Sequence, residues 1–330
     1  MKTLRQTFMT AAVLLVIGGW SAFWFYASGV VKEELDARIG QLAQQGIQIS
    51  CADREITGYP FRIEVRCGTV DVAFSDGGQV SVAGFRAVAL IYKPYHIILE
   101  ADAPLAARMS PFPANIEGQW TIGHASLELD DGELADAALS FENPDFGLIG
   151  DYASQKATGK LAELHLRRAP DDGDAADIAL RLKDLALTGT LANASAFDGG
   201  MLLRVPDGRD LLTGKIEPRG LIGRPLDVQE VFLSRGTARL TAHGELMVTG
   251  AGLLEGELEV SAVEPDQVAA LVAPFYPSDS KIPTAFQGAL MGLGKKSGTD
   301  AAASVSATLT FRDGMIRIGL VPIAQMTPLF

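Results

Sequence analysis

Residues 47–67 read IQISCADREITGYPFRIEVRC, and this stretch indicates a β-fold. Residues 61–67 alternate apolar and polar side chains, as a half-buried strand does, and residues 47–51 alternate before them. Between these runs Gly58 permits a positive φ and Pro60 fixes its own φ, so the tyrosine between them is predicted to centre a turn. The residues that this prediction singles out are Gly58, Tyr59, Pro60, Phe61 and Arg62.

Cys51 and Cys67 each lie eight residues from Tyr59. A turn centred on Tyr59 predicts an antiparallel register that places the two cysteines directly opposite each other. Cross-strand Cβ atoms lie about 4.5–5.5 Å apart, near the roughly 3.5–4.5 Å of a disulfide, and an oxidising compartment would form the bond. Two separately buried thiols are the alternative. No metal site is expected, because two cysteines without a nearby histidine supply too few ligands.

Before this stretch, residues 8–27 read FMTAAVLLVIGGWSAFWFYA, twenty residues without a charged side chain. A helix of that length rises about 1.5 Å per residue and spans the roughly 30 Å hydrocarbon core of a bilayer. Lys2 and Arg5 precede it, so the positive-inside rule predicts a cytoplasmic tail at residues 1–7 and the bulk of the chain outside the cytoplasm. The aromatic residues expected at the far membrane interface are Trp20, Trp24 and Tyr26.

A cleaved signal peptide is the alternative to a membrane anchor. Cleavage requires small residues in an A-x-A arrangement, whereas Phe25, two residues before Ala27, is bulky. The apolar run is also longer than the roughly 7–15 residues of a signal-peptide core. We therefore predict an uncleaved, single-pass anchor.

The periodicity changes after the apolar segment. Residues 28–46 carry apolar side chains at spacings of three and four, which predicts an amphipathic helix that Gly46 ends. Residues 47–330 consist of alternating segments separated by turn signals, such as Lys93-Pro94 and Asp131-Gly132, which predicts a long antiparallel meander. In that part of the chain we expect one helix, at residues 268–275.

A meander with one apolar face must close on itself, stack, or hold an apolar ligand. We therefore expect a mainly β fold in which a curved antiparallel sheet, with few short helices, forms a trough or a flattened barrel. The pattern leaves the choice between these two open. A weak subdivision is expected near residues 143–158, where the composition changes.

Charge and motifs exclude several functions. The chain has 40 acidic and 28 basic residues, a net charge of −12, whereas a nucleic-acid site needs a basic stripe and peripheral binding to anionic lipid needs a polybasic patch. The four histidines lie far apart without a second ligand at metal-binding spacing, and neither a G-x-S-x-G motif nor a carboxylate pair suggests catalysis. We predict no enzyme activity, no cofactor and no metal.

Three segments resemble a known family. Residues 55–63, EITGYPFRI, resemble the G-[FY]-P-[FY]-R hallmark of a proteobacterial envelope family known as domain of unknown function 2125. Residues 92–97, YKPYHI, resemble its aromatic-x-P-x-H turn through Pro94 and His96, and residues 311–319 resemble its closing motif. The resemblance covers nearly the whole chain and implies a protein of the bacterial envelope. The layout is also similar, more loosely, to AsmA-like proteins, which are associated with phospholipid transport or outer-membrane assembly.

Together these observations predict a non-enzymatic protein anchored in the inner membrane, with a cytoplasmic N-terminus and a periplasmic β-rich domain at residues 47–330. We expect it to bind or shuttle lipid, or another amphipathic envelope molecule, along an apolar sheet lining. The alternative is a scaffolding protein that docks an envelope partner through its sheet edges or its Gly58-Tyr59-Pro60 turn. The expected partners are the inner membrane, phospholipid or another amphiphile, and envelope proteins, but not nucleic acid.

Overall fold

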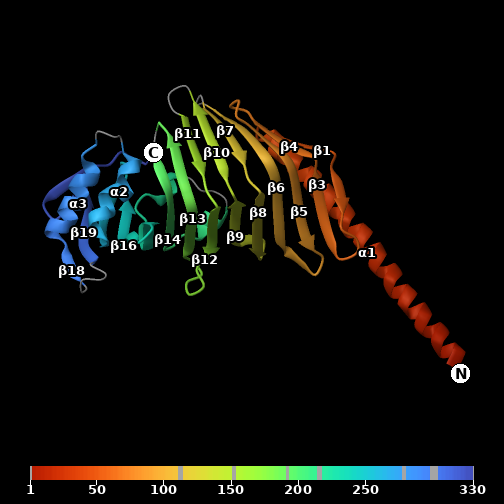
Figure 1. The fold of residues 1–330 in the computed structure, drawn as a ribbon. Coiled ribbons are helices and arrows are strands. Elements are labelled where there is room, and N and C mark those ends of the chain that lie inside the picture. Colours follow the sequence, from red (N-terminus) through yellow and green to blue (C-terminus); the bar gives the residue numbers. More distant parts are fainter. Residues whose placement is uncertain are drawn as a thin grey trace. The chain divides into compact units, whose positions relative to one another are not determined.

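The computed structural model describes residues 2–110, 114–150, 154–190, 193–213, 218–276, 280–297 and 304–329. It is mainly β, as predicted, with a large antiparallel sheet, a long N-terminal helix and a few short helices (Figure 1). The chain divides into two compact units, unit 1 of Met1–Ile116 and unit 2 of Glu117–Phe330. The expected subdivision at 143–158 thus falls inside unit 2, where two paired strands lie.

Unit 1 begins with a single helix, α1, which covers Lys2–Gln44 and joins the apolar and amphipathic segments without a break. The helix is long and apolar enough to cross a membrane. It ends before Gly46, whose φ of 85° suits a residue without a side chain. The strands that follow are β1 (Ile47–Ala52), β2 (Glu55–Thr57), β3 (Arg62–Cys67), β4 (Thr69–Phe74), β5 (Gln79–Leu90) and β6 (Lys93–Met109).

The predicted disulfide between Cys51 and Cys67 is present, with a Cα–Cα distance of 5.2 Å, but the predicted register is wrong. Cys51 lies opposite Val70 of β4 rather than opposite Cys67. The turn is centred after Tyr59, because Thr57 of β2 pairs with Glu64 of β3. The strands also break at Asp53, which has a φ of 51°, and at Gly68, and the disulfide links them beside this break.

The second predicted turn is also displaced. Leu90 pairs with Lys93, so the connection between β5 and β6 is Ile91-Tyr92, and Pro94 and His96 lie within β6. The next pair along the strands is Ala89 with Ile97, which leaves residues 94–96 in a bulge. A proline is tolerated there, because a bulged residue does not have to donate to the ladder.

Unit 2 is an antiparallel meander. Its strands follow one another in the order β8, β9, β12, β13, β14, β15, β16, β17, β19, β20 and β21. Their bounds are β8 (Ile122–Asp130), β9 (Glu133–Glu142), β12 (Leu161–Arg168), β13 (Ala176–Gly189), β14 (Ala194–Val205), β15 (Pro225–Arg235), β16 (Ala238–Val248), β17 (Leu254–Val263), β19 (Ser304–Arg312), β20 (Met315–Ile318) and β21 (Val321–Gln325).

Shorter elements complete the chain. β10 (Asp145–Gly150) pairs with β11 (Ser154–Thr158), and β11 pairs with the end of β13. The others are β7 (Ala114–Gln119), which crosses the boundary between the units, β18 (Lys295–Ser297), and the helical segments η1 (Arg209–Thr213), η2 (Pro218–Leu221), η3 (Pro265–Gln267), α2 (Val268–Val272), η4 (Ala273–Phe275) and α3 (Ile282–Leu293).

Two Asp-Gly turns form as their sequence predicts. Asp131 and Gly132 join β8 to β9 with φ angles of 51° and 82°, and Asp313 and Gly314 join β19 to β20 with 52° and 72°. Both connections have two residues in the left-handed region, the geometry that matches the twist of a hairpin. Asp and Gly enter this region at lower cost than branched residues, which is why the dipeptide is informative.

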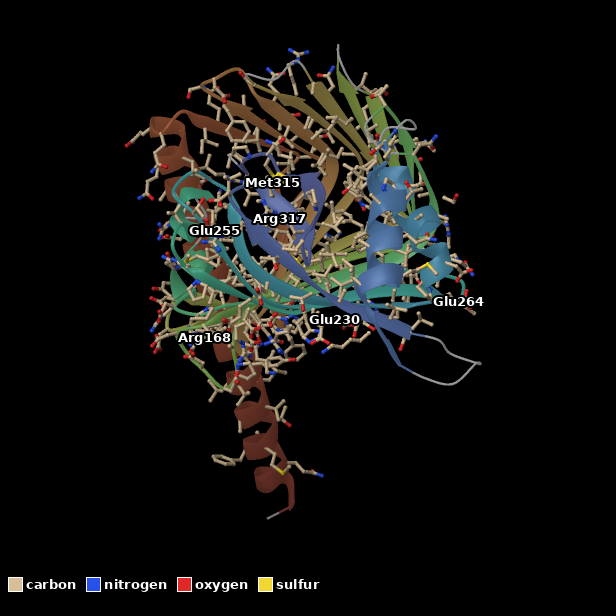
Figure 2. The ribbon with its side chains drawn as sticks, turned by 90° about the vertical axis from the view of Figure 1, so that its left-hand side faces the viewer. Arg168, Glu230, Glu255, Glu264, Met315 and Arg317 are labelled. Carbon is tan, nitrogen blue, oxygen red and sulfur yellow. A yellow bond between two sulfur atoms is a disulfide. The ribbon has the colours of Figure 1, made fainter. Side chains whose placement is uncertain are left out.

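The helical part of unit 2 exceeds the prediction. Residues 268–275 are helical as expected, in α2 and η4, but α3 at Ile282–Leu293 was not predicted. Pro283 lies in the first turn of α3, where its missing N–H is not required, so it starts this helix rather than preventing it. Figure 2 shows α3 and labels Met315 and Arg317 of β20, a strand that α3 contacts.

We predict that the double variant Cys51→Ala/Cys67→Ala is less stable than the wild type. Closing a loop of this size stabilises a fold by about 3 kcal/mol, and the loss should appear as a lower urea midpoint for the full chain in detergent. Reductant should lower the wild-type midpoint and leave that of the variant unchanged. Equal midpoints for the oxidised wild type and the variant would contradict a stabilising role.

Candidate functional site

The strand pairing of unit 2 sorts its side chains onto two faces. Residues directly opposite each other on antiparallel strands point to the same side of a sheet. One unbroken row of such partners, from β8 to β19, is apolar throughout. It comprises Ala125, Leu139, Leu164, Leu180, Met201, Val231, Ala242, Val260 and Ala307. We call the side that carries this row the apolar face.

The opposite side carries charge. A row of partners on this polar face comprises Glu128, Asp136, Arg167, Asp177, Arg204, Asp227, Glu245 and Glu257. Asp177 is buried and accepts from Nε of Arg204 at 2.7 Å and from Nη2 at 3.2 Å. Arg204 also donates to Asp171 at 2.9 Å. Arg204 therefore satisfies the buried carboxylate of Asp177 from the neighbouring strand.

One end of the apolar face is covered. Phe286 and Leu290 of α3 join Val260, Ala262 and Val305 of the sheet in a buried cluster. Leu211 of η1 belongs to a second buried cluster on β13–β17. The first cluster lies on β17, β19, β20 and β21, and the second extends across β13–β17, with Leu166 of β12 packed against it. The segment η1 also contacts β9, β12 and β13.

Two leucines of the apolar face, on β9 and β12, are exposed. Leu139 of β9 and Leu164 of β12 are direct partners in the register, and 38% and 43% of their surfaces are accessible. Neither residue belongs to the clusters that α3 and η1 form. These two adjacent side chains are therefore the exposed apolar part of the face that we consider as a candidate site.

Unit 1 also has apolar rows without a buried core. Ile63 and Val65 of β3 pair with Ala89 and Ala87 of β5, and these in turn pair with Ile97 and Leu99 of β6. All six are half-buried. Among the described apolar residues of unit 1, Trp24 and Cys67 are the fully buried ones.

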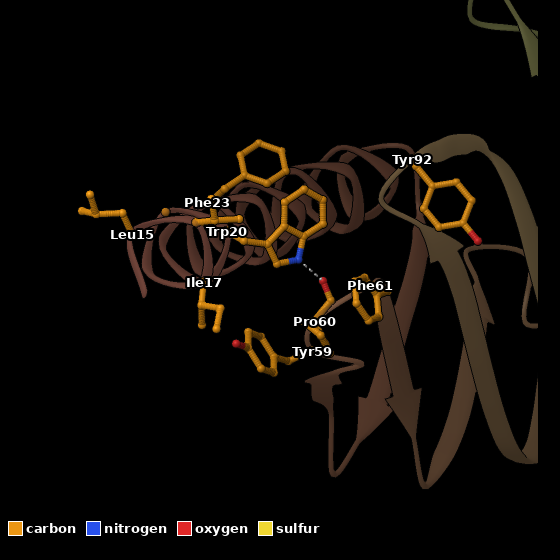
Figure 3. Close-up of a pocket in the computed structure, with 10 residues that line it drawn as sticks. Leu15, Ile17, Trp20, Phe23, Tyr59, Pro60, Phe61 and Tyr92 are labelled. Carbon is orange, nitrogen blue, oxygen red and sulfur yellow. Dashed lines mark hydrogen bonds between the residues drawn. The ribbon is translucent and has the colours of Figure 1, made fainter. Parts of the chain in front are cut away.

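The predicted Gly58-Tyr59-Pro60 turn packs against α1 and forms hydrogen bonds with it. Trp20 donates through Nε1 to the carbonyl of Pro60 at 2.8 Å, as Figure 3 shows, and Trp24 donates to the carbonyl of Arg62 at 2.8 Å. The hydroxyl groups of Ser21 and Tyr59 are 2.8 Å apart. Trp24 is buried edge-on against the ring of Tyr59, with 5.6 Å between the ring centroids.

The sequence predicted the turn but not its partner. Trp20 and Trp24 were predicted to lie at the membrane interface, and the structure uses both indoles as donors to the turn. Their spacing of four places them on one side of the helix, which is the signal that sequence reasoning did not use. Tyr26 is exposed, and so is Phe61, whose ring lies 6.3 Å from that of Trp20.

An open apolar pocket of about 980 Å³ lies between α1 and the two turns at that end of unit 1 (Figure 3). The Tyr59 turn forms one side of it and Tyr92, in the connection between β5 and β6, another. The α1 side is Leu15, Val16, Ile17, Gly19, Trp20 and Phe23. The lining is almost entirely carbon, so the pocket suits an apolar ligand.

A buried carboxylate follows the turn. Glu64 of β3 is fully buried, and Arg62 at 3.1 Å, Arg66 and Arg86 at 3.7 Å pair with it. Arg86 also pairs with Glu100, and this hydrogen bond raises the pKa of Arg86. A buried charge needs such partners, because an isolated carboxylate is strongly destabilised away from water. The ion pairs of this cluster link β3 to β5 directly after the turn.

The described residues include no group of three or more His, Cys, Asp or Glu side chains arranged to hold a metal ion. His96 lies in the bulge of β6, and His124, His165 and His243 lie on separate strands of unit 2. The predicted lack of a metal, a cofactor and an enzymatic activity stays a prediction.

The polar face predicts a pH dependence. The hydrogen bond from Arg204 lowers the pKa of Asp171 in the folded protein. Above the unfolded pKa of about 3.9 the ion pair therefore stabilises the fold. This stabilisation is lost as the pH falls through the lower pKa of the folded state. We predict that Asp171→Asn makes the loss of stability in acid shallower, as measured by urea unfolding from neutral to acidic pH. The control is Asp131→Asn, because asparagine also tolerates the positive φ of that turn. Parallel pH profiles for the Asp171 variant and the wild type would contradict the assignment.

Comparison with known proteins gives the chain a family but not an activity. The family described as "Uncharacterized protein conserved in bacteria (DUF2125)" matches residues 24–327, nearly the whole chain. No curated protein matches it. The looser resemblance to AsmA-like proteins is not confirmed by these comparisons. The residues that carry the family resemblance, at 55–63, 92–97 and 311–319, all fall within the matched range. The chain therefore belongs to the DUF2125 family of bacterial proteins.

Proposed function

We propose that this protein is a membrane-anchored, non-enzymatic carrier that binds lipid, or another amphipathic envelope molecule, on the apolar face of unit 2. The observation that supports it most directly is the exposed pair Leu139 and Leu164, on a face that α3 covers at its other end. An apolar ligand would have access to the face at these two leucines, beside the part that is packed.

The size and chemistry of the open part suit an acyl chain. The strands β8, β9, β12 and β13 are consecutive neighbours, so three strand spacings span on the order of 14 Å. Each methylene group that moves from water onto such a surface contributes about 0.8 kcal/mol. The face is lined by aliphatic side chains that make no directional demand on a ligand, which favours a flexible hydrocarbon chain over a polar metabolite.

The location follows from the N-terminal helix. The apolar part of α1 supports a single membrane span, and Lys2 and Arg5 before it support a cytoplasmic N-terminus. The Cys51–Cys67 disulfide is consistent with an oxidising compartment on the other side of that membrane. For a bacterial envelope protein these features favour an inner-membrane anchor with a periplasmic bulk.

Site-specific photo-crosslinking tests the proposal in living cells. A photoreactive amino acid at position 139 or 164 should capture phosphate-labelled lipid. The matched control places the photoreactive amino acid at position 165. His165 is exposed and adjoins Leu164, but its side chain points to the opposite face. Adducts with protein at 139 and 164 would instead favour the scaffolding alternative, and an absence of lipid adducts at both positions would refute the carrier.

We also predict that Leu164→Asp reduces the lipid captured from position 139 by about tenfold, since a carboxylate at the contact costs an apolar ligand at least 1–2 kcal/mol. Thermal unfolding should be nearly unchanged, because Leu164 is outside the packed clusters. The control variant His165→Asp should leave capture unaltered. Equal capture by both variants would show that lipid does not lie over Leu164.

A further inference from the structure

The Tyr59 turn contacts α1 inside its apolar segment rather than beyond it. Trp20 and Ser21 hold the turn, whereas the predicted membrane segment continues to Ala27 and the next charged residue is Lys32. Ala27 lies seven positions after Trp20, which corresponds to about 10 Å along a helix axis. If α1 spans the membrane, the turn lies about that far below the level at which the apolar segment ends.

The side chains at this end of unit 1 suit a lipid environment. Phe61 and Tyr92 are 61% and 67% exposed, and neither residues 57–61 nor residues 91–92 contain a charged side chain. Ile91 donates its N–H to the carbonyl of Phe61 at 3.1 Å, so the two turns lie side by side. Exposed aromatic rings on adjacent loops are unfavourable in water and favourable at the edge of a bilayer.

Four carbonyl groups between residues 58 and 62 accept hydrogen bonds from within unit 1. The carbonyl of Gly58 accepts from the N–H of Arg62, that of Phe61 from Ile91, and those of Pro60 and Arg62 from the two indoles of α1. Pro60 has no N–H to satisfy. Backbone groups within the hydrocarbon region require such partners, since an unsatisfied one costs several kcal/mol.

Charged residues set the limit of this apolar end. Arg62 follows Phe61 directly, and Lys93 follows Tyr92. Both side chains are exposed, and both are long enough to reach from an apolar level to the headgroups. The Glu64 cluster comes next along β3, so a membrane that covers the aromatic residues ends before that cluster.

We propose that the Tyr59 and Tyr92 turns are inserted into the outer leaflet beside α1, and that an acyl chain of the bilayer fills the pocket between them. One wall of the pocket is Leu15, Val16 and Phe23 of the membrane span itself, which lipid surrounds. The inference rests on the anchoring part of the proposed function and not on lipid binding by unit 2.

A depth measurement on the full chain in phosphatidylcholine–phosphatidylglycerol vesicles tests the insertion. Tyr92→Cys and Gln79→Cys place a thiol-reactive NBD label beside the two ends of β5, at exposed positions, while Cys51 and Cys67 stay in their disulfide. Because Leu90 and Gln79 are the ends of a strand that rises about 3.3 Å per residue, the two labels report levels that differ by tens of ångströms.

We expect phospholipid brominated on its acyl chains to quench the label at position 92, and aqueous iodide to quench it several-fold less than the label at 79. A third label, at Val16→Cys, reports on α1 alone. If brominated lipid quenches the label at position 16, while the label at position 92 behaves like the label at position 79, the turns are not inserted. The membrane span of α1 is then still supported. If iodide reaches position 16, the membrane span fails as well.

Discussion

The constraint on which the structure depends is the alternation of side chains along an antiparallel strand. Because the strands of unit 2 from β8 to β19 share an apolar row, pairing them produces a face that water does not favour, and something must cover it. α3 covers this face over β17 and β19, where Val260, Ala262 and Leu290 are buried, and η1 contributes Leu211 to the cluster on β13–β17. At Leu139 and Leu164 the same face is exposed, so the alternation that shapes the sheet also produces the proposed ligand site.

Alternation and turn chemistry were the parts of the fold that the sequence could predict. Asp131-Gly132 identified its hairpin because few residues enter the left-handed region cheaply. The register around Cys51 could not be predicted, since it depends on breaks at Asp53 and Gly68 that no turn signal in the sequence marked. α3 was not predicted because Pro283 is compatible with either the start of a helix or a loop. The apolar residues of α3 are explained only by the sheet that the helix covers, which is not apparent from the local sequence.

The candidate sites divide in the same way. The family motif at residues 55–63 identified the turn. The attachment of this turn to α1 depends on contacts with residues some forty positions earlier in the chain, and no local pattern specifies such contacts. Trp20 and Trp24 were interpreted as interface residues from their chemistry, and that chemistry, an apolar ring with one donor, is also what lets them hold the carbonyls of Pro60 and Arg62. Leu139 and Leu164 look like ordinary core residues in sequence, because exposure is decided by what does not pack over them.

The two units are stabilised by different means. Unit 2 has buried clusters, whereas the described part of unit 1 has half-buried apolar rows, a disulfide, the ion pairs around Glu64 and the seat of its turn on α1. A domain without a packed core has a small free energy of unfolding, so its contacts with α1 contribute a larger share of that stability. Trp24 is the one large apolar side chain fully buried among the described residues of unit 1, and α1 supplies it. The stability of unit 1 therefore depends on its contacts with α1, because removing the helix removes Trp24 and the two indole hydrogen bonds to the turn.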